Sequence, residues 1–192
     1  MNKIIVTIIL IASIVSSKRH DKPTDKCLVL AIGKGTDIGP YQAGAIAGLV
    51  ESLGNEADYD VVTGVAMGAL NARIVSQYSA SESKHMHKAL RKLFNLIAVN
   101  FWHEIAAQPL YESKNYSYIW TALFEPSLYS DNELNSFIDK TFTDQPFEKS
   151  VIIGITNLLN GSYASFNETD GQEALLNALK ASVSYPGVFP PE

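Results

Sequence analysis

Residues 59–72 contain the pattern that decides the fold, and they read YDVVTGVAMGALNA. The apolar run at the start of this stretch is typical of a strand, and its last residues favour a helix. Between the two, Gly64 and Gly68 flank a turn centred on Ala66. Strand, tight turn and helix in this order form a nucleophile elbow, whose pattern is Gly-x-Ser-x-Gly. The stretch therefore predicts the scaffold of an acyl hydrolase with alanine in place of the serine nucleophile.

Glycine-rich turns between strands and helices occur in every doubly wound protein, so the elbow interpretation depends on the surrounding sequence. Cys27–Ile32 is an apolar run of strand length, and we expect a parallel strand buried on both faces. The glycine-rich loop Gly33–Gly39 follows it, and Tyr41–Leu53 then predicts an amphipathic helix. The next expected strand is Tyr59–Thr63. This order predicts two adjacent parallel strands with the helix crossing between them.

Two functions are compatible with the glycine-rich loop. A dinucleotide site would need an acidic residue about 20 positions later, at the end of the second strand. Asp58 and Asp60 instead lie before or at the start of that strand. The alternative is an oxyanion hole, in which backbone N–H groups point at the elbow. Its residues would be Gly33, Lys34, Gly35, Thr36 and Gly39.

Three stretches of the sequence together resemble the patatin-like phospholipases. Gly39–Gly44 reads GPYQAG and is similar to the A-Y-Q-A-G start of a helix in that family. The elbow matches the family's G-x-S-x-G-A-L-N-A at every written position except the serine. Ala181–Pro191 reads ASVSYPGVFPP and is similar to the family block A-S-x-A-x-P-x-x-F-P-P, with Ser184 at an alanine position. The resemblance extends from about Cys27 to Glu192.

This resemblance implies a serine hydrolase with a Ser-Asp dyad, and the sequence departs from that pattern at several positions. Ala66 stands at the serine. In the loop, Lys34 and Thr36 replace glycines and Ile38 replaces the usual arginine. The family's aspartate belongs to a D-G-G or D-G-A motif after the last block, and the sequence ends before it. Asp170–Gly171 precedes that block, so its expected role is a turn or a helix cap.

By resemblance we expect an α/β fold, a three-layer sandwich with a mainly parallel central sheet, in a patatin-like domain over residues 27–192 that is truncated at its C-terminus. We expect a lipid acyl hydrolase homologue, of phospholipase or esterase type, that is catalytically impaired and binds lipid. A gene fragment and a natural short pseudoenzyme remain open. The alternative functions are an active acyl hydrolase with an unforeseen nucleophile and a dinucleotide-binding domain. The expected partner is a lipid or acyl-chain ligand, with a membrane surface as a further partner, and no cofactor or metal is expected.

The N-terminus predicts entry into the secretory pathway. Lys3 and an apolar run precede small residues at Ser16 and Ser17, which is typical of a cleaved signal peptide over residues 1–17. Residues 18–26 would then be a polar linker. The apolar run is shorter than the roughly 20 residues of a membrane span, and an uncleaved signal anchor is the alternative.

Three features are interpreted together with secretion. Asn115, Asn160 and Asn167 begin Asn-x-Ser/Thr sequons and are predicted glycosylation sites. Cys27 is the only cysteine, which excludes an intramolecular disulfide. The net charge of −5 argues against a nucleic-acid partner, which would require a basic face.

Weaker patterns predict the remaining elements. Ser81–Trp102 is an expected amphipathic helix, on which His85 and His87 are surface residues. An aromatic segment is predicted to be core, with a lipid-facing rim as the alternative, and comprises Trp102, Tyr111, Tyr116, Tyr118 and Trp120. The expected later elements are a helix beginning near Ser130–Glu133, a strand at Val151–Leu158, a two-residue hairpin turn at Asn160–Gly161, a return strand at Ser162–Phe166 and a helix at Glu173–Ser182.

Overall fold

The computed structural model describes residues 26–35, 38–53, 57–77, 100–107, 112–113, 125, 127–144 and 146–192. Several predictions concern residues outside these ranges and are not tested by the structure: residues 1–17, most of the linker, Thr36, Asn115, most of Ser81–Trp102 with His85 and His87, and Tyr111, Tyr116, Tyr118 and Trp120. Among the helices of the described ranges, none combines the length and the apolar character that crossing a membrane requires.

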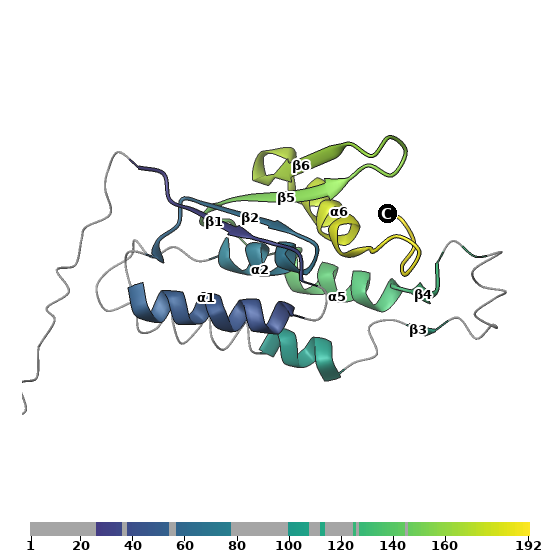
Figure 1. The fold of residues 1–192 in the computed structure, drawn as a ribbon, viewed down its shortest axis with the longest axis horizontal. Coiled ribbons are helices and arrows are strands. Elements are labelled where there is room, and N and C mark those ends of the chain that lie inside the picture. The colour runs from purple at the N-terminus through teal and green to yellow at the C-terminus, as the bar shows by residue number, and fades with distance from the viewer. Residues whose placement is uncertain are drawn as a thin grey trace, which may run out of the picture.

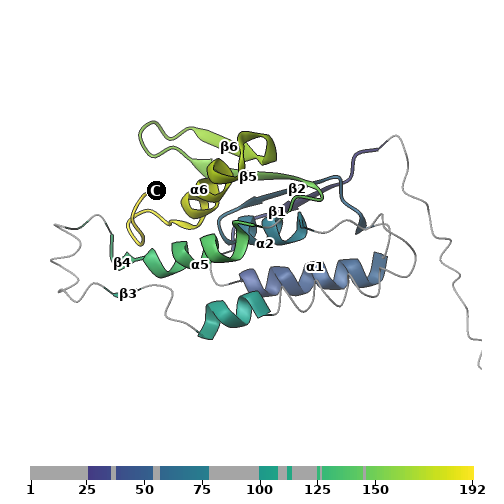
Figure 2. The same cartoon turned by 180° about the vertical axis from the view of Figure 1, so that it is seen from behind.

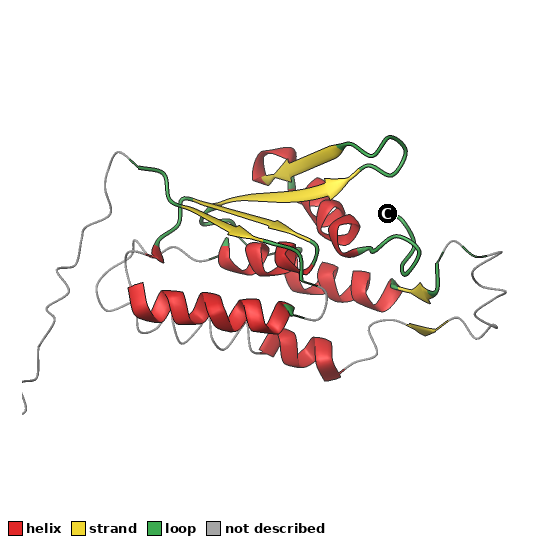
Figure 3. Ribbon diagram, in the orientation of Figure 1, coloured by secondary structure: helices red, strands yellow, loops and turns green. Residues whose placement is uncertain are grey.

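A four-stranded sheet forms the centre of the fold (Figures 1 and 3). Its strands are β1 (Val29–Ile32), β2 (Val61–Val65), β5 (Ser150–Thr156) and β6 (Tyr163–Asn167), in the order β1-β2-β5-β6. The first three are parallel, and β6 is antiparallel to β5. Helix α1 (Gly39–Leu53) connects β1 to β2, as predicted. The expectation of an α/β fold with a mainly parallel sheet is therefore confirmed.

The burial of the first strand differs from the prediction. Strand β1 is buried on one face only: Val29 and Ala31 share a face and are exposed, Val29 to 51%, whereas Leu30 and Ile32 on the other face pack with the core. In α1, Gly44 and Gly48 are four residues apart, a spacing that would permit close packing, but a Cβ at either would have no atom within 4 Å. The helix instead buries Ala43 and Ile46.

Helix α2 (Met67–Val75) is the central helix of the molecule (Figure 2). It contacts β1, β2 and β5 on one side and α1 on another, and every residue from Gly68 to Val75 is buried. The core accordingly lies between the sheet and this helix, with α6 (Gln172–Val183) packed beside α2 against β5. Fully buried side chains at this contact are Val62, Leu70, Val151, Ile153, Leu175 and Leu179.

One buried residue of α2 is charged. The Arg73 side chain is 1% exposed, and its Nη1 donates to Ser76 Oγ and to the Pro146 carbonyl, each at 3.2 Å. The guanidinium carbon lies 4.1 Å from the centre of the Phe147 ring. Burial lowers the pKa of Arg73 to about 10, so the side chain is still cationic at neutral pH.

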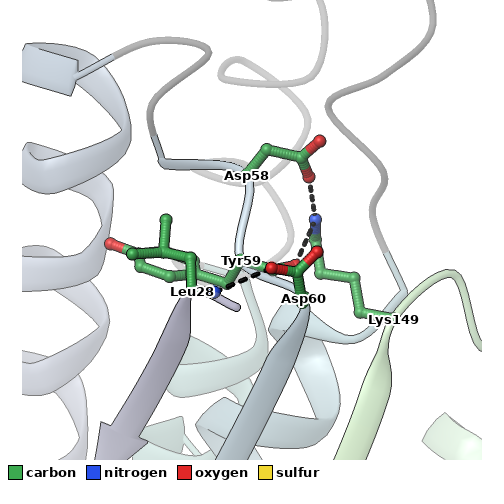
Figure 4. Close-up of polar contacts among 5 residues, drawn as sticks. All are labelled: Leu28, Asp58, Tyr59, Asp60 and Lys149. Carbon is green, nitrogen blue, oxygen red and sulfur yellow. Dashed lines mark hydrogen bonds and ion pairs between the residues drawn. The ribbon is translucent and has the colours of Figure 1, made fainter. Parts of the chain in front are cut away.

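Polar contacts hold together the amino ends of the three parallel strands (Figure 4). Lys149 Nζ, just before β5, forms an ion pair with Asp58 and donates to the Tyr59 carbonyl at 3.1 Å. Asp60 Oδ2 accepts from the Leu28 N–H at 2.7 Å, which links β2 to β1. Asp58 and Asp60 therefore have structural contacts at the amino edge of the sheet.

The remaining described elements are short. Helix α5 (Asn132–Phe142) begins after Asp131, close to the predicted start, and residues 100–107 form a further helix. Strands β3 (Glu112–Ser113) and β4 (Tyr129–Ser130) pair antiparallel. The 3₁₀ helix η2 (Glu168–Asp170) has a capping box, in which Asp170 Oδ2 accepts from the Asn167 N–H, so Asp170 is a cap residue as predicted.

The β5–β6 hairpin has a longer connection than predicted. The last residue pair of the ladder is Thr156 with Tyr163, so residues 157–162 form the loop. Asn157 N–H donates to the Ser162 carbonyl at 2.9 Å, and Gly161 N–H donates to the Asn157 carbonyl at 2.8 Å. The prediction of a two-residue Asn160–Gly161 turn was wrong. The backbone of Asn157 bonds to both Ser162 and Gly161 and closes a wider loop, in which Gly161 has a φ of 71°.

Candidate functional site

The turn between β2 and α2 has the backbone strain of an elbow. Ala66 has φ 52° and ψ −135°, and it is the one non-glycine residue with positive φ in the described part of the chain. An L-residue in such a region costs about 1–3 kcal/mol and is retained only when the surrounding structure imposes it. The conformation at Ala66 therefore matches the geometry that the sequence pattern predicts.

Close backbone contacts explain both glycines of the turn. A Cβ on Gly64 would lie 2.4 Å from the Gly68 carbonyl oxygen, and a Cβ on Gly68 would lie 2.3 Å from the Gly33 carbonyl oxygen. Neither position can hold a side chain without moving the backbone. The second contact also brings the end of β1 and the start of its glycine loop against the first turn of α2.

Ser182 fixes the elbow from the opposite side. The Ala66 N–H donates to Ser182 Oγ at 2.7 Å, and that hydroxyl donates to the Gly154 carbonyl at 2.9 Å. One side chain of α6 thus joins the strained turn to β5. In the sequence, Ser182 lies in the last family-like block, and no role was predicted for it. Its position in that block was the only sequence feature that pointed to the site.

A network of side-chain hydrogen bonds holds both ends of the glycine loop. Gln42 Nε2 donates to the Gly33 carbonyl at 2.9 Å, and Asn71 Nδ2 donates to the Gly39 carbonyl at 3.0 Å. Trp102 Nε1 completes the network by donating to Asn71 Oδ1 at 3.0 Å. Trp102 is 7% exposed and leaves no space for a Cβ on Gly39, so this member of the aromatic segment belongs to the core.

Ala66 and Lys34 lie on the wall of one large cavity of about 1470 Å³. The wall also includes Pro40 and Met67, the β5–β6 hairpin and the segment after α6. Most of these side chains are apolar, among them Trp102, Ile105, Leu158, Phe166, Val183 and Phe189. The elbow and the glycine loop therefore meet at a large, mostly apolar cavity, as is common for small-molecule sites.

Two serine hydroxyls lie on the cavity wall near the elbow. Ser182 uses its proton toward Gly154, as described above. Ser184 Oγ lies 2.9 Å from the Lys180 carbonyl and 3.3 Å from Oδ2 of the buried Asp131. Because a hydroxyl has one proton, the nearer carbonyl competes with the carboxylate for it. Ser184 on the wall and the buried Asp131 therefore form a serine-carboxylate pair in which the Lys180 carbonyl is the nearer acceptor for the hydroxyl proton.

The dinucleotide alternative lacks its acidic residue in this structure. That interpretation requires a carboxylate at the carboxyl end of β2, beside the glycine loop. Asp60 is at the amino end and accepts from Leu28, while Val65 and Ala66 stand at the carboxyl end. In the described ranges, no three His, Cys, Asp or Glu side chains come together as a metal site.

The two described sequons differ in their surroundings. Asn160 is exposed in the hairpin loop, where its Oδ1 accepts from the Ser162 N–H at 2.9 Å. Asn167 is half-buried, and its Oδ1 caps η2 by accepting from the Thr169 N–H at 2.8 Å. Asn160 is thus the more accessible of the two for modification.

Comparison with known proteins gives one finding. A family model described as "Patatin-like phospholipase" matches residues 35–192, which include the elbow, most of the loop and the segment after α6. A search of the curated proteins finds no match.

Proposed function

The chain belongs to the patatin-like phospholipase family, and we propose that it is a lipid-binding member of these acyl hydrolases whose own catalysis is impaired. The observation that carries this proposal is Ala66, which keeps the strained elbow backbone and lies on the wall of a large apolar cavity. An acyl chain would occupy the cavity with its reacting end near the elbow. The site would bind the chain and leave it intact.

The chemical reason is the missing nucleophile. Covalent acyl transfer begins when a hydroxyl attacks the ester carbonyl and becomes acylated. The methyl group of Ala66 cannot form that bond, and an oxyanion hole without a nucleophile stabilises a species that does not form. Lys34 in the glycine loop further changes the environment of the carbonyl oxygen.

Ser184 supports a second candidate function, an active hydrolase with a substitute nucleophile. Its hydroxyl lies 3.3 Å from Asp131 on the cavity wall, and a small rotation of the side chain would make the carboxylate its acceptor. Ser184 would attack the ester, and Asp131 would take the proton and return it to the leaving alcohol. The same labelling experiment tests both candidates.

In that experiment the protein is incubated with a serine-directed fluorophosphonate and its intact mass is measured, with an active serine hydrolase as the positive control. We expect no stoichiometric adduct on the unaltered chain. An adduct that disappears in Ser184→Ala would establish the second candidate and refute catalytic impairment.

Chain binding is tested separately by displacement of an environment-sensitive apolar dye with methyl laurate. Ala106 lies on the cavity wall and is exposed, so Ala106→Trp should fill the cavity and weaken binding. The neighbouring Ala107 is also exposed but is not on the wall, and Ala107→Trp is the matched control. Equal binding by both variants would refute occupation of the cavity.

We also propose that the protein follows the secretory pathway and meets its lipid at a membrane surface. Support comes from the apolar N-terminal run and from the hairpin loop at the cavity, where Leu158 is 55% and Leu159 is 97% exposed. Secretion from a eukaryotic host should yield a chain whose mass falls on enzymatic deglycosylation, and Asn160→Gln should remove part of that shift. Retention inside the cell without a glycan would contradict secretion. Leu159→Asp should weaken sedimentation with phosphatidylcholine vesicles, and unchanged sedimentation would contradict the membrane contact.

A further inference from the structure

The cavity wall carries very little charge. Among the described residues that line it, Lys34 is the one cation and Glu192 is the one carboxylate. Glu192 Oε1 accepts from Asn135 Nδ2 at 2.5 Å, so this carboxylate already has a partner on α5. Among the described lining residues, the wall around both charges is neutral and largely apolar, which makes the Lys34 ammonium the main attraction for an anionic group inside the cavity.

The backbone next to Lys34 is held in place by contacts with α1 and α2. The carbonyl of the preceding residue, Gly33, accepts from Gln42 and lies against Gly68 in the first turn of α2. Lys34 therefore follows a fixed backbone point beside the elbow, while its own side chain is exposed and flexible enough to reach an occupant of the cavity. Ala66 places a methyl group where the pattern expects a hydroxyl, so the elbow offers no group that would react with such an occupant.

We propose that the cavity binds a long-chain carboxylate, a free fatty acid, with its head group at Lys34 and its chain along the apolar wall. This inference rests on the proposed function and specifies its ligand. A carboxylate gives Lys34 a charge-assisted contact, which is stronger than the contact with a neutral ester carbonyl. The partial positive charge at the start of α2 acts in the same direction. At about 1470 Å³, the cavity exceeds the roughly 300–1,000 Å³ of common ligand pockets, so a long chain fits.

The test compares ligands of one chain length in the dye-displacement assay on the full chain: laurate, methyl laurate, dodecanol and dodecyl phosphate, each below its micellar concentration. We expect laurate to bind about tenfold more tightly than methyl laurate or dodecanol, the preference that one contact to a charged group supplies. Dodecyl phosphate is expected to bind no more tightly than laurate. One ammonium pairs with one negative charge, so the second charge of the phosphate would enter the apolar cavity without a partner.

Three variants locate the preference. Lys34→Met keeps the apolar stem without the charge and should reduce the preference for laurate over methyl laurate to less than about twofold. Lys34→Arg should retain the preference. Lys140→Met, at an exposed lysine of α5 away from the wall, should leave all four affinities unchanged.

The outcomes separate this inference from the proposed function. If laurate and methyl laurate bind equally, or if the preference persists in Lys34→Met, the carboxylate site is refuted and chain binding stands. If dodecyl phosphate binds much more tightly than laurate, the head group is a phosphate and the fatty-acid assignment is wrong. If none of the four ligands displaces the dye, acyl-chain binding itself fails.

Discussion

The substitution Ala66→Gly should stabilise the protein, although glycine usually destabilises one. Ala66 has φ 52°, where an L side chain costs about 1–3 kcal/mol and glycine costs little. Against this relief, glycine has more freedom in the unfolded chain, worth about 0.4–1 kcal/mol. The lost methyl group is only half-buried and faces the cavity, so its contribution is below the roughly 0.8 kcal/mol of a fully buried methylene. We expect a net gain of about 1 kcal/mol in the free energy of unfolding.

Urea unfolding followed by far-UV circular dichroism measures this change, and the melting temperature should rise by about 2–4 °C for a chain of this size. The matched control is Ala47→Gly, which makes the same substitution in the interior of α1, where helical backbone is normal. That variant should lose about 1 kcal/mol. If Ala66→Gly loses as much as Ala47→Gly, the turn is not strained in solution and the elbow argument is refuted.

Two further predictions concern other contacts of the fold. Gly68→Ala places a Cβ 2.3 Å from the Gly33 carbonyl and should destabilise by about 1–3 kcal/mol, whereas Gly48→Ala on the open face of α1 should gain up to about 1 kcal/mol in the same unfolding assay; equal effects would contradict the close approach. The pKa of Glu168 in the folded state is below the ordinary value. Burial alone would raise this pKa, but hydrogen bonds from the Ser150 hydroxyl, the Val151 N–H and the Glu168 N–H together outweigh burial. Its contribution to stability is therefore present above the unfolded pKa and is lost as pH falls through the folded pKa, so Glu168→Gln should cost more at about pH 7 than at about pH 3; an equal cost at both values would contradict this linkage.

Local patterns in the sequence predicted the first two strands, the helix between them and the turn around Ala66. Each of these depends on neighbours in the chain: an apolar run forms a strand, and paired glycines permit a tight turn. The parallel pairing of β1 with β2 then follows from the crossover helix between them. The same logic overestimated the burial of β1, because no local pattern shows whether both faces of a strand are covered.

Contacts between distant residues explain what could not be predicted. Gly44 and Gly48 have the spacing of a packing face, yet the burial of α1 is determined by where α2 lies. The hairpin loop is wider than the Asn160–Gly161 signal suggests, because Asn157 and Ser162 close it first. The hydrogen bond from the Ala66 N–H to the Ser182 hydroxyl joins residues 116 positions apart. It could not be predicted from the sequence, because it forms only when α6 packs beside the elbow.

The buried cation of α2 determines how that helix is rotated about its own axis. Apolar contacts are non-directional, and a helix enclosed by small and aliphatic side chains could turn or slide within them at little cost. The Arg73 guanidinium has fixed donor directions, and its bond to the Pro146 carbonyl, which lies outside the helix, exists in one orientation only. A turn of the helix by one residue would break that bond and move the charge away from the Phe142 and Phe147 rings, and the lost bond to a charged group alone costs about 1.5–3 kcal/mol. Arg73 thus helps to fix the rotation of α2 about its axis. From about two turns away, it keeps the first turn of the helix facing the cavity.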